Sequence, residues 1–430
     1  IMNKVKAIIM GFGDRGQVYA EYAKKAPERF EIVGVVDPDT VRVEKAKKLY
    51  GLSDDMCFTD PQKFYAKGKI CDAVINATMD SLHFKTTVPL LNAGYNVLLE
   101  KPVSNSPEEL RELSRLAKQN NVVLMICHVL RYAPFYKKIK QVLLSGEIGN
   151  VKHMHLAENV AIYHVLSSYI RGKWKSEKEC GSGMLMAKCC HDLDLIVWLK
   201  GENNEVEKVS SLGSRAFFTS KNKPRGGGTR CLVDCAVEKD CPYSCKKLYL
   251  DNDVYPFLIW TGVDGKDWSE VTDRHLREEL LKTVNPHGKC CFEDKDLVDQ
   301  QSVIVMFKDG STASLDMTGG VSRPGRSIHI VGTTGEIEGF LEENKFVVRK
   351  YEPDTLGYTE RTVEISEDVS GAHSGGDLRL AEDFVSAVLK RPKSVSCTDI
   401  DDSISGHLAV IAAEQSRKTD KTVYLDTLVD

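Results

Sequence analysis

The chain has 430 residues, of which 42% are hydrophobic and 28% charged, a composition typical of globular proteins rather than disordered or fibrous ones. Its 58 lysines and arginines are outnumbered by 62 aspartates and glutamates, and the formal net charge is −4 at pH 7. Because there is no basic excess to neutralise a phosphate backbone, we do not expect nucleic acid as the main partner. The length predicts about two or three domains.

Neither a membrane span nor a secretory signal is expected. No stretch approaches the roughly 20 apolar residues that cross a bilayer, and the apolar run at residues 5–10 is too short for a signal sequence. The thirteen cysteines are an odd number spread through a long chain, unlike a secreted disulfide scaffold. We therefore expect a soluble cytoplasmic protein with mostly reduced thiols and no membrane partner.

The first 127 residues alternate short β-branched runs with longer amphipathic stretches. This pattern predicts a doubly wound α/β fold, in which helices connect the strands of a parallel sheet. The predicted strands cover residues 5–10, 31–36, 73–77, 96–99 and 122–126. A helix is predicted to begin after Ser106, which can cap it, because Pro107 suits the first turn and Glu109 can close a capping box.

A glycine-rich segment follows the first predicted strand. It consists of Gly11, Phe12, Gly13, Asp14, Arg15 and Gly16 and opens a helix, so that backbone N–H groups can face a pyrophosphate. Asp37 ends the second strand, about 20 residues later, where a carboxylate accepts hydrogen bonds from an adenosine ribose. The acid favours NAD over NADP, whose 2′-phosphate it would repel, although the nearby Arg42 complicates this preference.

Polar residues also follow two later strands, at the sheet edge where ligands bind in such folds. Glu100, Lys101 and Pro102 come after one strand. Lys101 can donate to a substrate hydroxyl and stabilise an alkoxide, although a solvated lysine is an equal alternative. Thr78 and His83 follow another strand end and are predicted to lie near the cofactor or to cap a helix.

After about residue 128 the pattern changes to longer strand-like segments. Residues 303–307 and 312–317 are examples, and they predict a mixed or antiparallel sheet in a second, α+β domain. Helical periodicity covers residues 377–389 and 402–416, and a short strand is predicted at 422–425.

A second constellation follows the glycines at 181 and 183. If the segment is helical, Lys188, His191 and Asp194 are spaced at i, i+3 and i+6, with the first two one turn apart on a common face. Such groups are costly to bury without a purpose. His191 is a natural proton acceptor for an alcohol that loses a hydride, although a histidine bonded structurally to Asp194 or to backbone is the alternative.

With these motifs the chain resembles the Gfo/Idh/MocA (glucose-fructose oxidoreductase / inositol dehydrogenase) family over nearly its whole length. The resemblance rests on residues 11–16, Asp37, Thr78, His83, 100–102, 146–149, 191–194 and 331–336. It implies a Rossmann domain at 1–127, and a second domain at 128–430 with a large open sheet and a cysteine-rich insertion at about 221–250. It further implies a nicotinamide over Lys101 and His191, and a homo-oligomer formed through the open sheet.

One position departs from the family. Many family dehydrogenases have an aspartate four residues before the catalytic histidine, whereas this chain has Ala187 there and Lys188 next to it. Lys188 is therefore a third candidate catalytic residue, since a second cation would stabilise an anionic or enolate intermediate.

The candidate substrate-binding residues come from three segments. The segment after the last Rossmann strand, with Arg131 and Tyr132, resembles a branch of the family that acts on glycosides, although packing between the domains is an equal alternative. An aromatic and basic loop is suited to a sugar ring, and polar residues further along the chain could add contacts. These other candidates are His164, Tyr169, Arg171, Trp174, Asp194 and His373.

Four cysteines follow the spacing C-x3-C-x5-C-x3-C, namely Cys231, Cys235, Cys241 and Cys245. Thiolates at this density could hold a structural zinc ion and stabilise an insertion too short for its own core, although reduced or redox-paired thiols are an alternative.

These observations predict an NAD-dependent oxidoreductase that transfers a hydride between a carbohydrate ring hydroxyl and nicotinamide. A first alternative is an NAD-dependent redox glycosidase that uses transient oxidation, elimination, water addition and reduction. A second, of another class, is a noncatalytic NAD-binding sensor, which would leave the lysines and the histidine unexplained.

Overall fold

A computed structural model describes residues 4–201, 205–260, 273–370 and 372–428. The strands are β1 (Val5–Met10), β2 (Phe30–Val36), β3 (Cys57–Phe58), β4 (Ala73–Asn76), β5 (Asn96–Leu99), β6 (Leu124–Ile126), β7 (Val151–Ala161), β8 (Val206–Ser214), β9 (Gln300–Phe307), β10 (Thr312–Val321), β11 (Gly325–Gly332), β12 (Gly335–Phe340), β13 (Lys345–Glu352), β14 (Gly357–Glu364) and β15 (Val423–Tyr424). The helices are α1 (Asp14–Ala20), α2 (Tyr22–Lys25), α3 (Thr40–Tyr50), α4 (Pro61–Tyr65), α5 (His83–Asn92), α6 (Pro107–Gln119), α7 (Pro134–Leu144), α8 (Ile162–Val165), α9 (Glu177–Cys180), α10 (Met184–Lys200), α11 (Arg274–Lys282), α12 (Gly376–Val388) and α13 (Ile400–Thr419).

The N-terminal domain contains a six-stranded parallel sheet in the order β3-β2-β1-β4-β5-β6. The chain reverses direction across the sheet between β1 and β4, which is the switch point where doubly wound folds bind ligands. The predicted Rossmann sheet is therefore confirmed. Ser106 caps α6 by accepting from the Glu109 N–H at 3.2 Å, but the Glu109 carboxylate accepts from Ser104 instead of closing a capping box.

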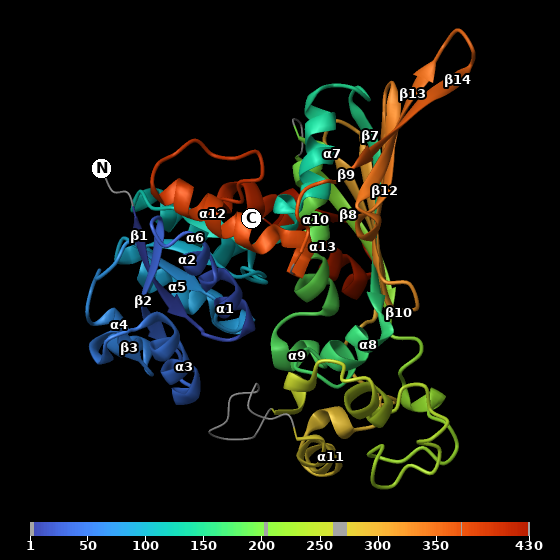
Figure 1. Ribbon diagram of the computed structural model, residues 1–430. Coiled ribbons are helices and arrows are strands. Elements are labelled where there is room, and N and C mark those ends of the chain that lie inside the picture. The colour runs from blue at the N-terminus through green and yellow to red at the C-terminus, as the bar shows by residue number, and fades with distance from the viewer. Residues whose placement is uncertain (1–3, 202–204, 261–272, 371, 429–430) are drawn as a thin grey trace.

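The C-terminal domain contains a nine-stranded mixed sheet in the order β14-β13-β12-β11-β7-β10-β9-β8-β15. β7 and β10 run parallel, whereas the other pairs are antiparallel. Along β7, alternate residues from Met154 to Val160 are buried on one face. The helices α10 and α13 lie between the two domains, and α10 is buried along nearly its whole length (Figure 1).

The chain returns to the N-terminal domain after completing the large sheet. α12 packs its apolar residues, including Leu380 and Phe384, into the same core cluster as β1 and β2. Figure 1 shows this helix over the N-terminal domain. The predicted boundary at 127/128 therefore separates the two sheets, but residues on its C-terminal side complete the N-terminal core.

Between β8 and β9 lies an insertion, in which the described residues 215–260 and 273–299 have little regular structure (yellow-green to gold in Figure 1). Its own core consists of only a few buried side chains, among them Cys231, Cys245, Tyr249 and Leu281. Across the described ranges, no helix is both long and apolar enough to traverse a bilayer.

Candidate functional site

Two glycines of the loop after β1 are required by close backbone contacts. A Cβ on Gly11, whose φ is +87°, would lie 2.4 Å from the Ala77 carbonyl oxygen, and one on Gly16 would lie 2.1 Å from the Gly11 oxygen. At Gly13 the nearest atom is Arg42 Nη1 at 3.8 Å, so that face of the loop is open. The loop therefore packs tightly against the sheet and leaves room at Gly13 for a dinucleotide to approach the backbone.

The Asp37 carboxylate is held at the end of β2. It accepts hydrogen bonds from the Phe12 N–H at 2.8 Å and the Asp39 N–H at 2.9 Å. Arg42 Nη1 lies 3.7 Å from Asp37, and the Arg42 side chain is 51% exposed. The carboxylate is thus fixed beside the glycine loop, where an adenosine ribose binds in this fold, while Asp14 on the loop itself is exposed.

Arg15 connects α1 to the residue after β5 and to α12. Its guanidinium donates to Glu100 at 2.7 Å and also bonds Tyr19 and Asp377, the last on α12. Although burial alone would raise the pKa of Glu100, the positive charges of Arg15 and Lys101 keep it below its usual value. Nε and Nη2 of Arg15 are therefore bonded within the protein, and its predicted contact with the cofactor stays a prediction.

Thr78 and His83 fix the loop after β4. The Thr78 hydroxyl donates to Asn76 at 2.8 Å. The buried His83 ring faces the carbonyl oxygens of Thr78 at 3.0 Å and Pro102 at 2.6 Å. The His83 ring nitrogens are thus occupied by backbone, so this residue shapes the sheet edge rather than offering a group to a ligand.

Lys101 connects the N-terminal sheet edge to α10. Its Nζ donates to the Ala187 carbonyl oxygen at 2.9 Å, across 86 residues of sequence. No carboxylate forms an ion pair with Lys101 anywhere in the described part of the chain. This bond places the Lys101 ammonium against the turn of α10 that carries Lys188 and His191.

His191 is buried, 3% exposed, and neither of its ring nitrogens has a hydrogen-bond partner within the described residues. Burial lowers its pKa well below the usual value, and the positive charges of Lys101 and Arg326 lower it further. The imidazole is therefore neutral near pH 7 and has a free nitrogen with which to accept a proton. The alternative in which Asp194 satisfies this histidine is wrong, because the Asp194 carboxylate is bonded to Arg131.

A charged cluster beside Lys188 was not predicted from the sequence. Lys188 Nζ lies 3.4 Å from Glu158, and Arg326 lies 2.7 Å from Glu158 and 2.8 Å from Asp192. Glu158 occupies an inward position of β7, where its neighbours at alternate positions are apolar. A carboxylate at an inward position of an alternating strand is the signal that could have revealed this cluster.

Three predicted substrate contacts lie in the protein interior instead. Arg131 donates to the Asp194 carboxylate at 2.7 and 2.6 Å and also to the Cys397 and Asp402 carbonyls. Tyr132 donates to Asp383 at 2.7 Å. All three side chains are at most 4% exposed and their polar groups are already bonded, so they hold the domains together rather than meeting a substrate.

The aromatic loop after β7 closes one side of the cleft between the domains. Trp174 Nε1 donates to Asp80 of the N-terminal domain at 3.1 Å, and its ring lies 6.0 Å from that of the buried Tyr169. His164 Nδ1 is 3.1 Å from the Tyr255 hydroxyl. Burial and the charge of Lys188 lower the pKa of His164 to about 3. On the other side, His373 lies 5.7 Å from the His191 ring and 3.2 Å from Asp377.

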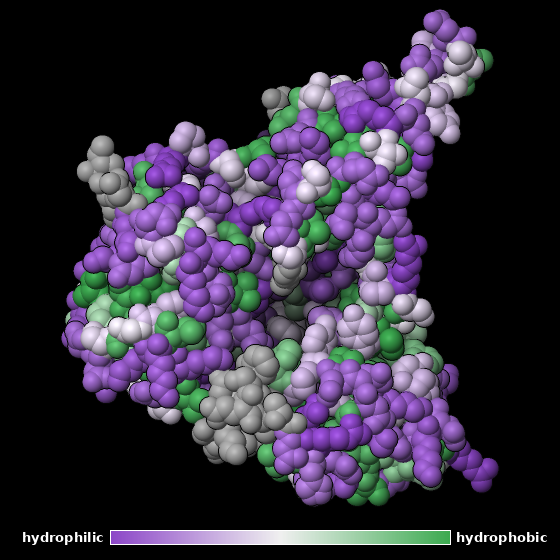
Figure 2. All heavy atoms as spheres, in the orientation of Figure 1, coloured by the Kyte–Doolittle hydropathy of each residue, from purple (hydrophilic) through white to green (hydrophobic). Residues whose placement is uncertain are grey.

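Figure 2 shows the molecular surface hollowed between the two domains, and this hollow is called the recess below. The structure brings Lys101, Lys188, His164, His191 and His373 close enough together for their charges to shift one another's pKa. The arrangement can donate a hydrogen bond from a cation, accept a proton on a neutral imidazole and exclude bulk water.

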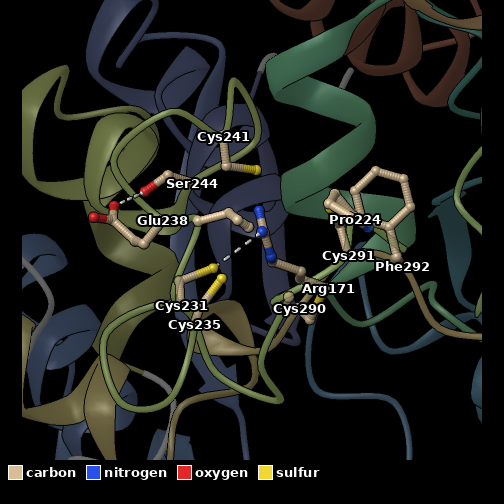
Figure 3. Close-up of a pocket in the computed structure, with 12 residues that line it drawn as sticks. Arg171, Pro224, Cys231, Cys235, Glu238, Cys241, Ser244, Cys290, Cys291 and Phe292 are labelled. Carbon is tan, nitrogen blue, oxygen red and sulfur yellow. Dashed lines mark hydrogen bonds between the residues drawn. The ribbon is translucent and has the colours of Figure 1, made fainter. Parts of the chain in front are cut away.

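Arg171 connects three parts of the cysteine-rich insertion. The buried Arg171 guanidinium donates to the Lys289 carbonyl at 2.8 Å, the Tyr243 carbonyl at 2.7 Å and Cys231 Sγ at 3.7 Å. Figure 3 shows it pointing toward Cys231, with Cys235 and Cys241 beside it. Nε and Nη2 are thus bonded within the protein, whereas Nη1 has no partner among the described residues, and the predicted substrate contact of Arg171 stays a prediction.

The predicted zinc site is not assembled. Cys231, Cys235 and Cys241 line a cavity of about 20 Å³ together with Cys290 and Cys291, but Cys245 does not line it. Among residues 4–201, 205–260, 273–370 and 372–428, no three Cys, His, Asp or Glu side chains are grouped so as to hold a metal ion. Of the four predicted ligands, Cys231 is bonded to Arg171, and the grouping of ligands that the zinc prediction requires is not found among the described residues.

Two family models match the chain. One, described as an oxidoreductase family domain with an NAD-binding Rossmann fold, covers residues 5–128. The other, described as the C-terminal alpha/beta domain of the same oxidoreductase family, covers residues 140–425. The NAD-binding description fits the open glycine loop and the Asp37 carboxylate.

Three individual proteins illustrate the similarity. YteT of Bacillus subtilis (strain 168), which is named as an oxidoreductase, is 25% identical over 392 residues, 86% of this chain and 87% of that protein. The 2,7-anhydro-N-acetylneuraminate hydratase of Mediterraneibacter gnavus is 28% identical over 200 residues, 46% of this chain and 50% of that protein. The WlbA dehydrogenase of Bordetella pertussis, solved with NADH and UDP-GlcNAcA, shares the fold with a TM-score of 0.67 at 15% identity, covering 98% of each chain.

Proposed function

The chain belongs to the Gfo/Idh/MocA oxidoreductase family, and from that premise we propose that it transfers a hydride between NAD and a ring hydroxyl of a carbohydrate. The observation that carries the proposal is the bond of 2.9 Å between Lys101 Nζ and the Ala187 carbonyl. It joins the cofactor-binding sheet edge to the helix turn that bears His191. A cation and a neutral proton acceptor thus stand together at the recess.

The two residues have complementary roles in this proposal. Lys101 donates a hydrogen bond to the substrate oxygen and stabilises the negative charge that develops there. His191 accepts the hydroxyl proton on a ring nitrogen that has no partner in the protein. When bound, NAD supplies the hydride acceptor. The buried Tyr169 and the half-buried Trp174, whose rings are 6.0 Å apart, restrict water and orient a sugar ring.

NAD is the proposed cofactor rather than NADP. The Asp37 carboxylate, fixed by the Phe12 N–H, would accept from a ribose 2′-hydroxyl and repel a 2′-phosphate. Arg42 is close enough to Asp37 to weaken this preference. Binding of the two dinucleotides to the wild-type protein and to Asp37→Ser, compared by intrinsic fluorescence, tests the assignment.

A second candidate is a redox glycosidase, in which oxidation of a ring carbon acidifies the neighbouring C–H and the aglycone is eliminated. The absence of any carboxylate hydrogen-bonded to His191 within the described residues, together with the extra cation Lys188, favours it. Two ammonium groups suit an enolate-like intermediate. One relative, 28% identical over 200 residues, is named as a hydratase, an enzyme that adds or removes water.

The decisive experiment incubates the protein with NAD and a panel of sugars and glycosides in D₂O. Net NADH formation, followed by absorbance, supports the dehydrogenase. Release of an aglycone with deuterium incorporation and no NADH, followed by proton NMR, supports the redox glycosidase. Tight NAD binding with neither signal across the panel would contradict both and leave the noncatalytic sensor.

Two finer proposals accompany the function. Leu212 on β8 and Ile304 on β9 are 73% and 58% exposed on the outer face of the large sheet. We propose a homo-oligomer through that face, which size-exclusion chromatography with light scattering tests. A cytoplasmic location accords with thirteen cysteines that are all free.

A further inference from the structure

At the recess, the lysine side chains are more exposed than the carboxylates of Glu158 and Asp192. The side chains of Glu158 and Asp192 are only 5% and 1% exposed, behind the recess, whereas the Lys188 side chain is 24% exposed. Lys101 is also partly exposed. A ligand that approaches this cluster would therefore meet the Lys188 ammonium before it met Glu158 or Asp192.

Lys188 retains hydrogen-bonding capacity. Its contact with Glu158, at 3.4 Å, is an ion pair, and Glu158 is shared with Arg326 at 2.7 Å. Within the described ranges the Lys188 ammonium makes no hydrogen bond, although it carries three N–H donors. Arg326 differs, because it donates to Asp192 at 2.8 and 3.3 Å.

The charges nearest His164 and His191 are positive, whereas His373 lies beside the Asp377 carboxylate. Burial, followed by the charges of Lys188, Arg326 and Lys101, lowers the pKa of His164 to about 3. At His191, Lys101 and Arg326 act in the same direction as burial. The histidines stay neutral, so the positive field comes from Lys101, Lys188 and Arg326.

We propose that the substrate is a sugar ring bearing a carboxylate, a hexuronic acid or its glycoside, and that Lys188 binds that carboxylate while Lys101 serves the reacting oxygen. This inference rests on the proposed function. It makes Lys188 a specificity residue and not a catalytic one. A carboxylate suits the site better than a phosphate for two reasons. The guanidinium groups of Arg15, Arg131 and Arg326 are already paired with carboxylates of the protein. In addition, Glu158 beside Lys188 would repel the second negative charge of a phosphate.

The experiment compares matched sugars. Methyl gluco-, galacto- and mannopyranosides are tested beside their 6-carboxylates, 6-carboxamides and 6-phosphates, by turnover with NAD and by equilibrium dialysis of the unreacted ligands. A hydrogen bond to a charged group is worth about 1.5–3 kcal/mol, so the carboxylate of at least one configuration should bind about 10- to 100-fold more tightly than its carboxamide.

Three variants locate the effect. Lys188→Gln should remove most of this preference and act mainly on KM, whereas Lys188→Arg should retain it. Lys295→Gln is the matched control, because Lys295 is also ion-paired, with Glu293 at 3.1 Å, and its side chain is 20% exposed. That control should leave the preference unchanged.

Several results would overturn the inference. They are equal or better binding of the neutral or phosphorylated sugars, binding of none of the ligands, and an equal effect of Lys188→Gln on carboxylate and carboxamide. Failure of the proposed function is distinct, since it would appear as carboxylate-selective binding without turnover of any sugar. Turnover of neutral glycosides without that selectivity would overturn only the inference about the carboxylate.

Discussion

Two charged clusters meet on α10 and differ in how far the protein satisfies them. The reaction cluster consists of Lys101, Lys188 and His191, and the anchor cluster consists of Arg131, Asp194 and Tyr132. In the anchor cluster every side chain bonds to another protein group. In the reaction cluster, His191 has no bond within the described residues, and Lys188 has only a shared ion pair. Since buried polar groups are normally bonded, the incomplete cluster is where a ligand is expected.

The largest effect should come from the reaction cluster. His191→Ala should lower kcat/KM by about 10²- to 10⁴-fold, because the proton acceptor is lost. The thermal midpoint should also fall, because His191 is buried and the shorter side chain leaves a cavity, so activity is compared at a temperature where the variant is folded. The checks are steady-state kinetics on whichever substrate the panel identifies and thermal unfolding. Full activity in both His191→Ala and Lys101→Ala would show that neither residue has the catalytic role proposed for it.

The anchor cluster should respond in stability instead. Asp194→Ala leaves the buried Arg131 unpaired, which typically costs about 3–5 kcal/mol of unfolding free energy. The matched control is Asp54→Ala, because Asp54 pairs with Lys47 but its side chain is 90% exposed. Removal of such a surface pair changes stability by no more than about 1 kcal/mol. Urea unfolding measures the free energy of unfolding of both variants. An equal loss in Asp194→Ala and Asp54→Ala would show that the anchor cluster does not stabilise the fold more than a surface ion pair does.

The buried histidines between the clusters should make stability depend on pH. His128 lies 5.7 Å from the His191 ring and 5.0 Å from the His407 ring, and burial lowers the pKa of His407 to about 3. Below about pH 6.5 His407 is protonated in the unfolded chain, whereas in the folded protein it stays neutral down to about pH 3. The free energy of unfolding therefore decreases as the pH is lowered. For His407 alone the loss from pH 7 to pH 5 is about 2 kcal/mol.

Urea unfolding at pH 7 and pH 5 measures this loss. His407→Gln should make the dependence shallower by about that amount, whatever its stability at pH 7. A variant with the wild-type slope would show that His407 does not contribute.

The smallest effect should come from the edge of the anchor cluster. Tyr132→Phe removes one hydrogen bond to Asp383 and should cost about 1 kcal/mol, because Asp383 still accepts from Ser394. KM should not change, since the hydroxyl points into the protein interior. A raised KM with an unchanged free energy of unfolding would instead support the substrate contact that was predicted for Tyr132 from the sequence.

The N-terminal domain was predictable because its signals are local. β1 and β5 match the predicted residues 5–10 and 96–99, and α6 begins after Ser106 as its capping pattern indicates. Apolar runs, caps and glycine turns act over a few residues, so they can be recognised in one segment at a time. The return of α12 to this domain was not predictable, because no local pattern says which core a helix joins.

The candidate site divides in the same way. Sequence alone identified the oxidoreductase family, the glycine loop with Asp37, and the candidates Lys101, Lys188 and His191, because these follow strand ends or helical spacing. Only the tertiary structure decided which charged groups are free, since their partners lie far along the chain. Arg131 meets Asp194 across 63 residues, Lys101 meets Ala187 across 86, and Arg326 meets Asp192 across 134. Whether a buried charge is an anchor or a site depends on such partners, because in a low-dielectric interior only a bonded charge is stable without a ligand.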